Sequence, residues 1–383
     1  MKSLCRLAAV SIASLIIAGC GFWGDDGEEV EPNPLVSFEA EKTVSVLWSA
    51  SVGSGLGNKY HQFRPAIDGE HIFASDKDGS VYAFDVKTGK KVWEVELETT
   101  IVGGVGAGVG RVAVANEEGE VVVLSAEDGA ELWRANVNSE VTSAAQFNEE
   151  LAVFQLINGK VIAFDIVTGE QRWLYDSQIP RLTLRGTSSP IVASDVTFAG
   201  FASGKLVAID NAKGAAIWES RVALPQGRSE LERMVDIDGR PLLVDRMIYV
   251  SSYQGRLVAI NPFRAQVVWA QDVSSYHSLA EGFVNIYVSE SNDAVQAFDR
   301  ASSASVWRQA ELENRGITAP ATIGSDVVVA DYEGYLHFMS QTDGHFVARH
   351  KVDSSGVYGD MLVKDDVLYV LTNSGRLAAL SIQ

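Results

Sequence analysis

Three observations predict that this chain of 383 residues is an all-β protein, an eight-bladed β-propeller built from four-stranded antiparallel blades. A unit of about 40 residues, which is a blade-sized period, recurs along residues 43–383. Within each unit, short apolar strands alternate with glycine-containing turns. The two ends of this region are complementary halves of one further unit, so the N- and C-terminal strands are expected to pair and close the ring.

The clearest copy of the unit reads Gly-Ser-Val-Tyr-Ala-Phe-Asp-Val-Lys-Thr-Gly from Gly79, with a tryptophan four residues later at Trp93. The seventh copy has Ala348 in place of the tryptophan. An eighth copy, 375–381, stops before its tryptophan, and the missing end stands at 43–48. A ring closed by this split unit has no free sheet edge, whereas a solenoid would need capping repeats. The seven complete copies begin at Gly79, Gly119, Gly159, Gly204, Gly255, Asp293 and Gly334.

Strands in the first unit are predicted at residues 70–74, 80–85 and 90–95, with turns between them in which glycine supplies a positive φ. Residues 121–124 are apolar at every position, which predicts strands covered on both faces, as in stacked blades. The recurring tryptophan is therefore interpreted as a packing residue between blades, the alternative being a ring that stacks on a ligand.

The N-terminus has the pattern of a bacterial lipoprotein signal. A largely apolar run, residues 7–18, is too short to span a membrane but suits a signal peptide. It ends in small residues just before Cys20, which resembles a lipobox; the alternative is an ordinary cleaved signal with a chance cysteine. We expect residues 1–19 to be removed, Cys20 to carry the lipid, residues 20–42 to form an extended acidic tether and residues 43–383 to form the propeller.

Charge and cysteine content narrow the classes of function. The formal net charge of −19 disfavours binding to nucleic acid and to anionic lipid headgroups. Of the two cysteines, Cys5 lies in the predicted signal and Cys20 takes the lipid, so neither a disulfide nor thiol catalysis is expected. The residue after Cys20 is Gly21 and not aspartate. By resemblance to bacterial lipoproteins, this favours the outer membrane, with the propeller facing the periplasm.

No sequence pattern favours catalysis or a metal site, and no cofactor is expected. Gly103–Gly108 resembles a phosphate loop but has no helix after it, and the alternative is a strand hairpin in the second blade. Four aspartates recur at one repeat position, which indicates turn residues bonded to their own backbone: Asp85, Asp165, Asp210 and Asp299. The histidines lack metal-ligand spacing and are interpreted as surface or turn residues: His61, His71, His277, His337, His345 and His350.

Two consecutive connections between units are longer than the others. The spacing from the tryptophan position to the next unit is 31 and 37 residues for these two, against 24–27 elsewhere. Residues 174–190 and 219–241 are therefore expected to form one raised patch, because insertions on one face of a repeat protein usually form its binding face.

The content of these two links favours protein docking. The first has two isolated leucines with no evident core, followed by an arginine. The second has Ser229 and Glu232 at capping-box spacing, which predicts a helical turn, followed by two aspartates. Leucine and arginine beside carboxylates are typical of a docking patch, the alternative being that the links only pack on each other. The residues expected to bind protein are Leu182, Leu184, Arg185, Asp236 and Asp238.

The repeat resembles the PQQ-like repeat of quinoprotein dehydrogenases over nearly all of residues 43–382. This resemblance implies the fold but not the function, since propellers support many unrelated sites. Such enzymes have long insertions between blades, a calcium site, a catalytic aspartate and commonly a vicinal disulfide. The lean units of this chain argue against an enzyme of this kind, and the absent cysteine pair argues less strongly in the same direction.

In finer detail the sequence resembles the BamB family, the propeller lipoproteins of the outer-membrane β-barrel assembly machinery. The resemblance includes the lipobox, the eight units, both long links and the segments 333–337 and 351–356. It implies a non-enzymatic scaffold in the Bam complex, with nascent outer-membrane proteins as further partners. The alternative is a divergent PQQ-dependent, quinone-binding propeller. In the family, the positions that contact a POTRA domain of BamA are the equivalents of Leu182, Leu184, Arg185, Asp236 and Asp238.

Overall fold

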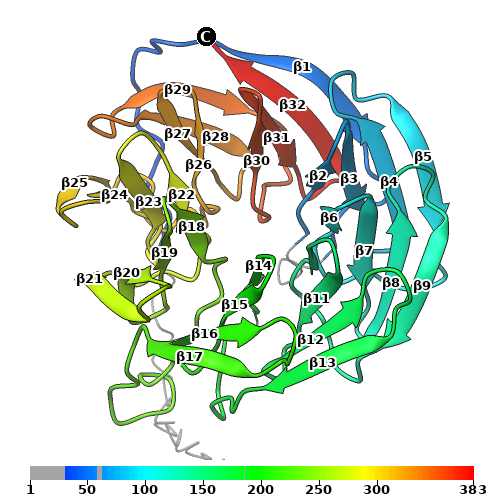
Figure 1. Ribbon diagram of the computed structural model, residues 1–383. Coiled ribbons are helices and arrows are strands. Elements are labelled where there is room, and N and C mark those ends of the chain that lie inside the picture. Colours follow the sequence, from blue (N-terminus) through cyan, green and yellow to red (C-terminus); the bar gives the residue numbers. More distant parts are fainter. Residues whose placement is uncertain (1–30, 58–62, 185) are drawn as a thin grey trace, which may run out of the picture. The chain divides into compact units, whose positions relative to one another are not determined.

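The computed structural model describes residues 31–57, 63–184 and 186–383. In this part of the chain every regular element is a β-strand, and the strands form eight antiparallel sheets of four strands each. Figure 1 shows the sheets as blades of a ring, with the shortest strand of each blade nearest the axis. The prediction of an all-β, eight-bladed propeller is confirmed.

Blades are numbered in chain order, and the strands of each are given from the axis outward. Blade 1 contains β2 (Ala66–Asp68), β3 (His71–Ser75), β4 (Ser80–Asp85) and β5 (Lys91–Glu96). Blade 2 contains β6 (Gly106–Gly108), β7 (Arg111–Ala115), β8 (Glu120–Ser125) and β9 (Glu131–Asn136). Blade 3 contains β10 (Gln146–Phe147), β11 (Leu151–Gln155), β12 (Lys160–Asp165) and β13 (Gln171–Asp176). Blade 4 contains β14 (Ile191–Val192), β15 (Val196–Gly200), β16 (Lys205–Asp210) and β17 (Ala216–Arg221).

The remaining blades repeat the same order. Blade 5 contains β18 (Leu242–Val244), β19 (Met247–Val250), β20 (Arg256–Asn261) and β21 (Gln266–Asp272). Blade 6 contains β22 (Ala280–Glu281), β23 (Asn285–Ser289), β24 (Val295–Asp299) and β25 (Ser305–Gln309). Blade 7 contains β26 (Ala321–Ile323), β27 (Asp326–Ala330), β28 (Tyr335–Ser340) and β29 (Phe346–Lys351). Blade 8 contains β30 (Leu362–Lys364), β31 (Val367–Leu371), β32 (Arg376–Ile382) and β1 (Val44–Ser51).

The ring closes through blade 8, as predicted. Strand β1 pairs antiparallel with β32, in a register that runs from Val44 opposite Ile382 to Ser51 opposite Arg376. The backbones of Thr43 and Gln383 exchange two further hydrogen bonds, of 2.8 and 3.1 Å. The N-terminal strand therefore covers the outer edge of β32 and locks the two ends of the propeller together.

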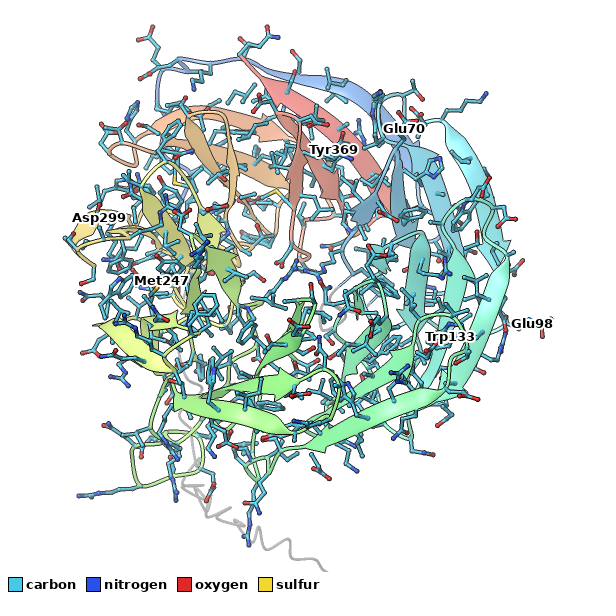
Figure 2. All side chains as sticks on the ribbon, viewed as in Figure 1. Glu70, Glu98, Trp133, Met247, Asp299 and Tyr369 are labelled. Atoms are coloured by element: carbon cyan, nitrogen blue, oxygen red, sulfur yellow. The ribbon has the colours of Figure 1, made fainter. Side chains whose placement is uncertain are left out.

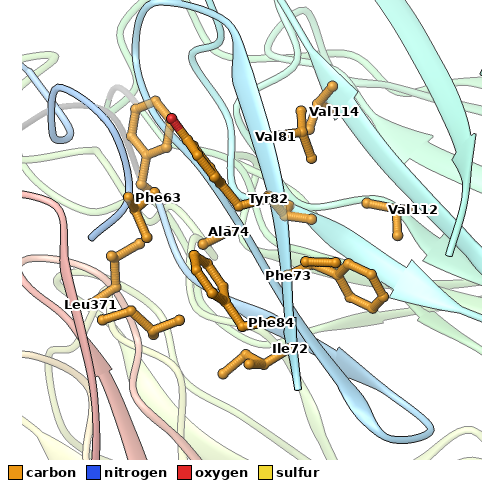
Figure 3. Packing of buried hydrophobic residues seen from close by; sticks show 14 of the residues in the cluster. Phe63, Ile72, Phe73, Ala74, Val81, Tyr82, Phe84, Val112, Val114 and Leu371 are labelled. Carbon is orange, nitrogen blue, oxygen red and sulfur yellow. The ribbon is translucent and has the colours of Figure 1, made fainter. Parts of the chain in front are cut away.

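Neighbouring blades are held together by apolar faces and by the recurring tryptophan. Figure 3 shows buried side chains meeting between blades, among them Leu371 of blade 8 and Val112 and Val114 of blade 2. The indole of Trp133, labelled in Figure 2, donates to the Ile166 carbonyl of the next blade at 3.1 Å. The other six tryptophans at this repeat position make the same bond to the next blade. Their predicted packing role is confirmed.

The turn that receives each tryptophan is shaped for it. Gly89 lies in the turn between β4 and β5 with φ of 68°, and a Cβ there would stand 2.3 Å from Cε3 of Trp48. The aspartate that begins the turn, Asp85, accepts hydrogen bonds from the backbone of Lys87 and Thr88, as predicted. The equivalent aspartates of blades 3, 4 and 6 do the same.

Blade 7 has Ala348 where the other blades have tryptophan, and the reason is topological. Each tryptophan packs on the turn between the third and fourth strands of the next blade. Blade 8 has no such turn, because its third strand ends near Gln383 and its fourth strand is β1. A tryptophan at this position would have no turn to pack on, and the buried Ala348 packs with Val44 and Ile382 at the seam instead.

Residues 32–42, here called the strap, differ from the expectation of an extended tether. The Asn33 carbonyl accepts from Arg315 and the Val36 carbonyl from Arg349, both at 2.9 Å. Phe38 stacks on Phe346 with ring centroids 5.5 Å apart. These apolar and hydrogen-bonded contacts hold the strap on blades 6 and 7, so the compact unit that contains the propeller begins at residue 32 and not at residue 43.

One further expectation needs correction, and another is confirmed. His337 is wholly buried, not a surface residue, because it lies on β28, a third strand covered on both faces; its Nε2 lies 3.0 Å from Asp331. The glycine-rich run ends in β6, the first strand of an antiparallel hairpin with β7, as predicted, and a Cβ on Gly106 would stand 2.3 Å from the Ala145 carbonyl oxygen. Glycine there permits close approach of neighbouring inner strands.

Candidate protein-docking site

The two long links flank blade 4 and meet each other. The first leads from β13 to β14 and the second from β17 to β18. The Leu184 amide of the first donates to the Asp236 carboxylate of the second at 2.9 Å. Farther along, the Ser188 hydroxyl donates to the Gly239 carbonyl at 3.0 Å. The structure thus brings together two segments that lie about 50 residues apart in sequence, as their neighbouring positions predicted.

Asp236 and Asp238 lie beneath the first link and do not form an exposed acidic rim. Asp236 has no exposed surface and Asp238 very little. Burial raises the pKa of Asp236 to about 6, partly opposed by the Leu184 hydrogen bond. Burial, with the Asp236 carboxylate beside it, raises the pKa of Asp238 to about 8. A Cβ on Gly186 would stand 3.1 Å from the Asp238 carboxyl carbon, so the first link packs directly on these carboxyl groups.

The second link contains the predicted capping box. The Glu232 amide donates to the Ser229 hydroxyl at 3.2 Å, and the Ser229 amide donates to the Glu232 carboxylate at 3.0 Å. The chain forms a turn there, and this turn does not continue into a helix. The side chain of Gln254, from the neighbouring blade 5 loop, donates to the Leu231 carbonyl at 3.2 Å and ties this turn to the ring.

Both links expose apolar side chains. Leu182 is 38% exposed and Leu184 is half-buried above the carboxyl groups. Sequence reasoning missed Ile179, Leu224 and Leu231, which are 43%, 55% and 63% exposed. These residues could have been found from the sequence, because they are apolar and lie in links that are longer than the fold requires. Arg185 and Cys20, both predicted functional residues, lie outside the described residues.

The described residues contain neither a metal-ligand cluster nor a helix able to cross a membrane. Among the described residues, no group of three or more His, Cys, Asp or Glu side chains is arranged to hold a metal ion. The described residues also contain no helix with the length and hydropathy needed to cross a membrane.

The eight blades and the enlarged link pair define a β-propeller protein with PQQ-like repeats. A family described as "Outer membrane protein assembly factor BamB" matches residues 32–100 and 77–309. The outer membrane protein assembly factor BamB of Pseudomonas aeruginosa is 44% identical over 376 residues, 98% of each chain. The chain therefore belongs to the BamB family.

Solved structures support the fold. The crystal structure of BamB from Moraxella catarrhalis matches with a TM-score of 0.82 at 24% identity, over 88% of this chain and 100% of that one. A europium-containing methanol dehydrogenase matches with a TM-score of 0.69 at 16% identity, over 85% of this chain and 84% of that one. The second likeness shows that the propeller fold is shared with a dehydrogenase, and it shows nothing about activity.

Proposed function

We propose that this chain is a non-enzymatic scaffold lipoprotein of the outer-membrane Bam complex. In this role it binds the POTRA domains of BamA and assists the folding and insertion of β-barrel proteins. Membership of the BamB family supports a role in outer-membrane protein assembly, because its relatives are named as assembly factors. Cys20, by its lipobox-like position, would carry the lipid that holds the propeller at the outer membrane, facing the periplasm.

One observation carries the docking part of the proposal. The Asp236 carboxylate fixes the Leu184 backbone, while the Leu182 side chain two residues earlier remains exposed. A preorganised apolar loop loses little conformational entropy on binding, which is the property of an interface hot spot. In this arrangement Leu182, Leu184 and Arg185 contact the partner, while Asp236 and Asp238 act from below by positioning the loop.

The test is the affinity for purified BamA POTRA domains, measured by titration calorimetry with the wild type and with Leu184→Ala/Arg185→Ala. Hot-spot truncation costs roughly 2 kcal/mol or more, so we expect at least a roughly thirtyfold weaker complex. Leu132→Ala, which removes an exposed leucine from β9, is the matched control and should bind as the wild type does. Equal affinities for the double variant and the wild type, with equal melting temperatures, would place the interface elsewhere.

The shared fold with quinoprotein enzymes gives the competing function a direct test. A quinone-dependent dehydrogenase would bind PQQ in the presence of calcium and show the quinone absorbance after gel filtration. We expect no retained quinone and no alcohol oxidation. Retention of stoichiometric quinone with turnover would overturn the non-enzymatic proposal and leave the docking measurement unaffected.

A further inference from the structure

The segments that enter the first strand of each blade bring eight equivalent residues to one level around the propeller axis. Each stands two positions before the inner strand, and five of the eight are glycine, alanine or serine. The other three are charged: Arg64 of blade 1, Arg240 of blade 5 and Asp360 of blade 8. Figure 2 shows side chains reaching into this central space. The charged residues therefore meet only because the ring is closed.

Arg64 and Asp360 have partners at this level. Arg64 Nη1 lies 3.8 Å from the Asp360 carboxylate, and its Nη2 donates to the Ser189 hydroxyl at 3.3 Å. The Ser278 hydroxyl donates to the same carboxylate at 2.8 Å. The single carboxylate at this level is thus shared between a guanidinium and a hydroxyl.

Arg240 has no such partner. Its backbone amide donates to Ser278, but its guanidinium forms no hydrogen bond or ion pair with any residue that the structure describes. The residue is exposed to solvent, yet it lines a cavity and is partly desolvated there. This partial burial, with the repulsion of Arg64, lowers the pKa of Arg240 to about 10, and Asp360 opposes the shift. A guanidinium offers five N–H donors, and no described side chain or backbone carbonyl accepts from the one of Arg240.

A cavity of about 360 Å³ adjoins this guanidinium. Arg64, Arg240 and Lys364 contribute positive charge to its lining, and Ile67 and Leu362 contribute apolar wall. Lys364 is engaged with the Gly69 carbonyl at 2.6 Å, but its charge remains. Three cations beside one carboxylate form an electropositive hollow inside a chain whose formal net charge is −19. The volume is within the range of small-molecule sites.

We propose that this central cavity binds a small oxyanion, a carboxylate or phosphate group, held by the guanidiniums of Arg240 and Arg64. Planar guanidinium forks match the two oxygens of such a group, and the bound negative charge would relieve the repulsion between the two arginines. The apolar wall leaves room for the carbon skeleton of a small metabolite. The site lies on the propeller axis and does not depend on the docking proposal.

The test is calorimetric titration of the full-length chain in detergent with inorganic phosphate and, separately, with citrate. The buffer is of low salt and free of other oxyanions, because salt screens such contacts. We expect saturable binding of one equivalent, weakened at least tenfold in Arg240→Gln. Arg264→Gln, which removes an exposed arginine from the turn between β20 and β21, should leave the affinity unchanged. Binding of phosphate alone, or of citrate alone, would support the site and assign its ligand class.

Absence of saturable binding with both probes, or equal affinity in Arg240→Gln and the wild type, would overturn the proposal. Loss of an unpaired guanidinium breaks no described contact, so the melting temperature of unliganded Arg240→Gln should equal or exceed that of the wild type. Arg240→Lys keeps the charge without the fork and should bind severalfold less tightly, which retains the test if the glutamine variant folds poorly. An equal, unsaturated heat in all variants would mean an unspecific ionic effect and would also overturn the site.

Discussion

Asp236 is a buried carboxyl group that joins the two long links. Its Oδ1 accepts the Leu184 amide, while its Oδ2 is buried with no hydrogen-bond partner among the described residues. A charge without full compensation is costly to bury, which is why the pKa of Asp236 rises to about 6. The group therefore fixes the loop at the expense of stability at neutral pH.

This cost predicts a pH dependence for Asp236→Asn, whose amide oxygen still accepts the Leu184 N–H. The pKa of Asp236 is raised from 3.8 when unfolded to about 6 when folded, so the folded state holds more protons between these values. The contribution of Asp236 to the free energy of unfolding of the wild type should thus fall as pH rises from about 4 to about 6, by up to about 3 kcal/mol. Melting temperatures at pH 4.5 and pH 8 measure it. The variant's advantage should appear only at the higher pH, and a pH-independent difference would contradict the assignment.

Glycine in the tryptophan-binding turn is required by contact and not only by backbone angle. Gly110 and Gly89 have similar φ, 72° and 68°, but a Cβ on Gly110 meets nothing within 4 Å. Gly110→Ala should cost about 1–2 kcal/mol through left-handed strain alone. Gly89→Ala should cost roughly 1–3 kcal/mol more, because the new methyl overlaps Trp48. Denaturant unfolding of the pair measures the difference, and equal costs would exclude the steric explanation.

At the scale of elements, the seam between blades 7 and 8 predicts the effect of restoring the repeat. Ala348→Trp would match the consensus of the other blades, yet blade 8 has no turn to receive the indole. The larger side chain should overpack the seam and destabilise the protein by about 1–3 kcal/mol. Trp133→Ala, which empties a formed contact, should cost about 3–5 kcal/mol. If Ala348→Trp stabilised the protein, the seam between blades 7 and 8 would have space for the indole, and the overpacking explanation would be wrong.

Much of the blade architecture could be predicted because it is encoded locally. Glycine turns, apolar strands and the tryptophan recur in each unit, and the split unit states how the ring closes. The strap could not be predicted, since residues 32–42 contain two prolines and directly follow an acidic run, a composition that favours an extended tether. Their partners, Arg315 and Arg349, lie 282 and 313 residues away in the sequence. No sequence pattern near either arginine indicates this pairing. Long-range contacts of irregular backbone leave no repeating pattern in the sequence from which they could be predicted.

The same distinction applies to the candidate site. The extra length of both links and their neighbouring positions predicted that they meet, and Asp236 bonded to Leu184 confirms it. The burial of Asp236 and Asp238 ran against expectation, because charged residues beside an arginine are usually exposed. The meeting of Arg64, Arg240 and Asp360 was also out of reach, since it depends on the geometry of the closed ring.

For the whole molecule, Cys20→Ala tests the proposed anchor. One acyl chain binds a membrane weakly, and stable attachment takes several chains, so loss of the lipidated cysteine should release the protein or leave it unprocessed. Fractionation of cells in high salt measures the outer-membrane share, with the wild type as the reference. Equal sedimentation of both proteins with the outer membrane would refute the lipoprotein proposal, since salt removes ionic attachment.

The strap would set how far the propeller lies from a lipid on Cys20. Because residues 32–42 are bound to blades 6 and 7, the chain from Cys20 to the start of the strap at Pro32 is twelve residue steps long. Fully extended, that length reaches at most about 40 Å. A lipid on Cys20 would therefore confine the protein to a thin layer beneath the membrane and raise its effective concentration there. In Figure 1 the strap side, at blade 7, and the long links, beside blade 4, lie on different arcs of the ring, so the strap itself does not cover the long links.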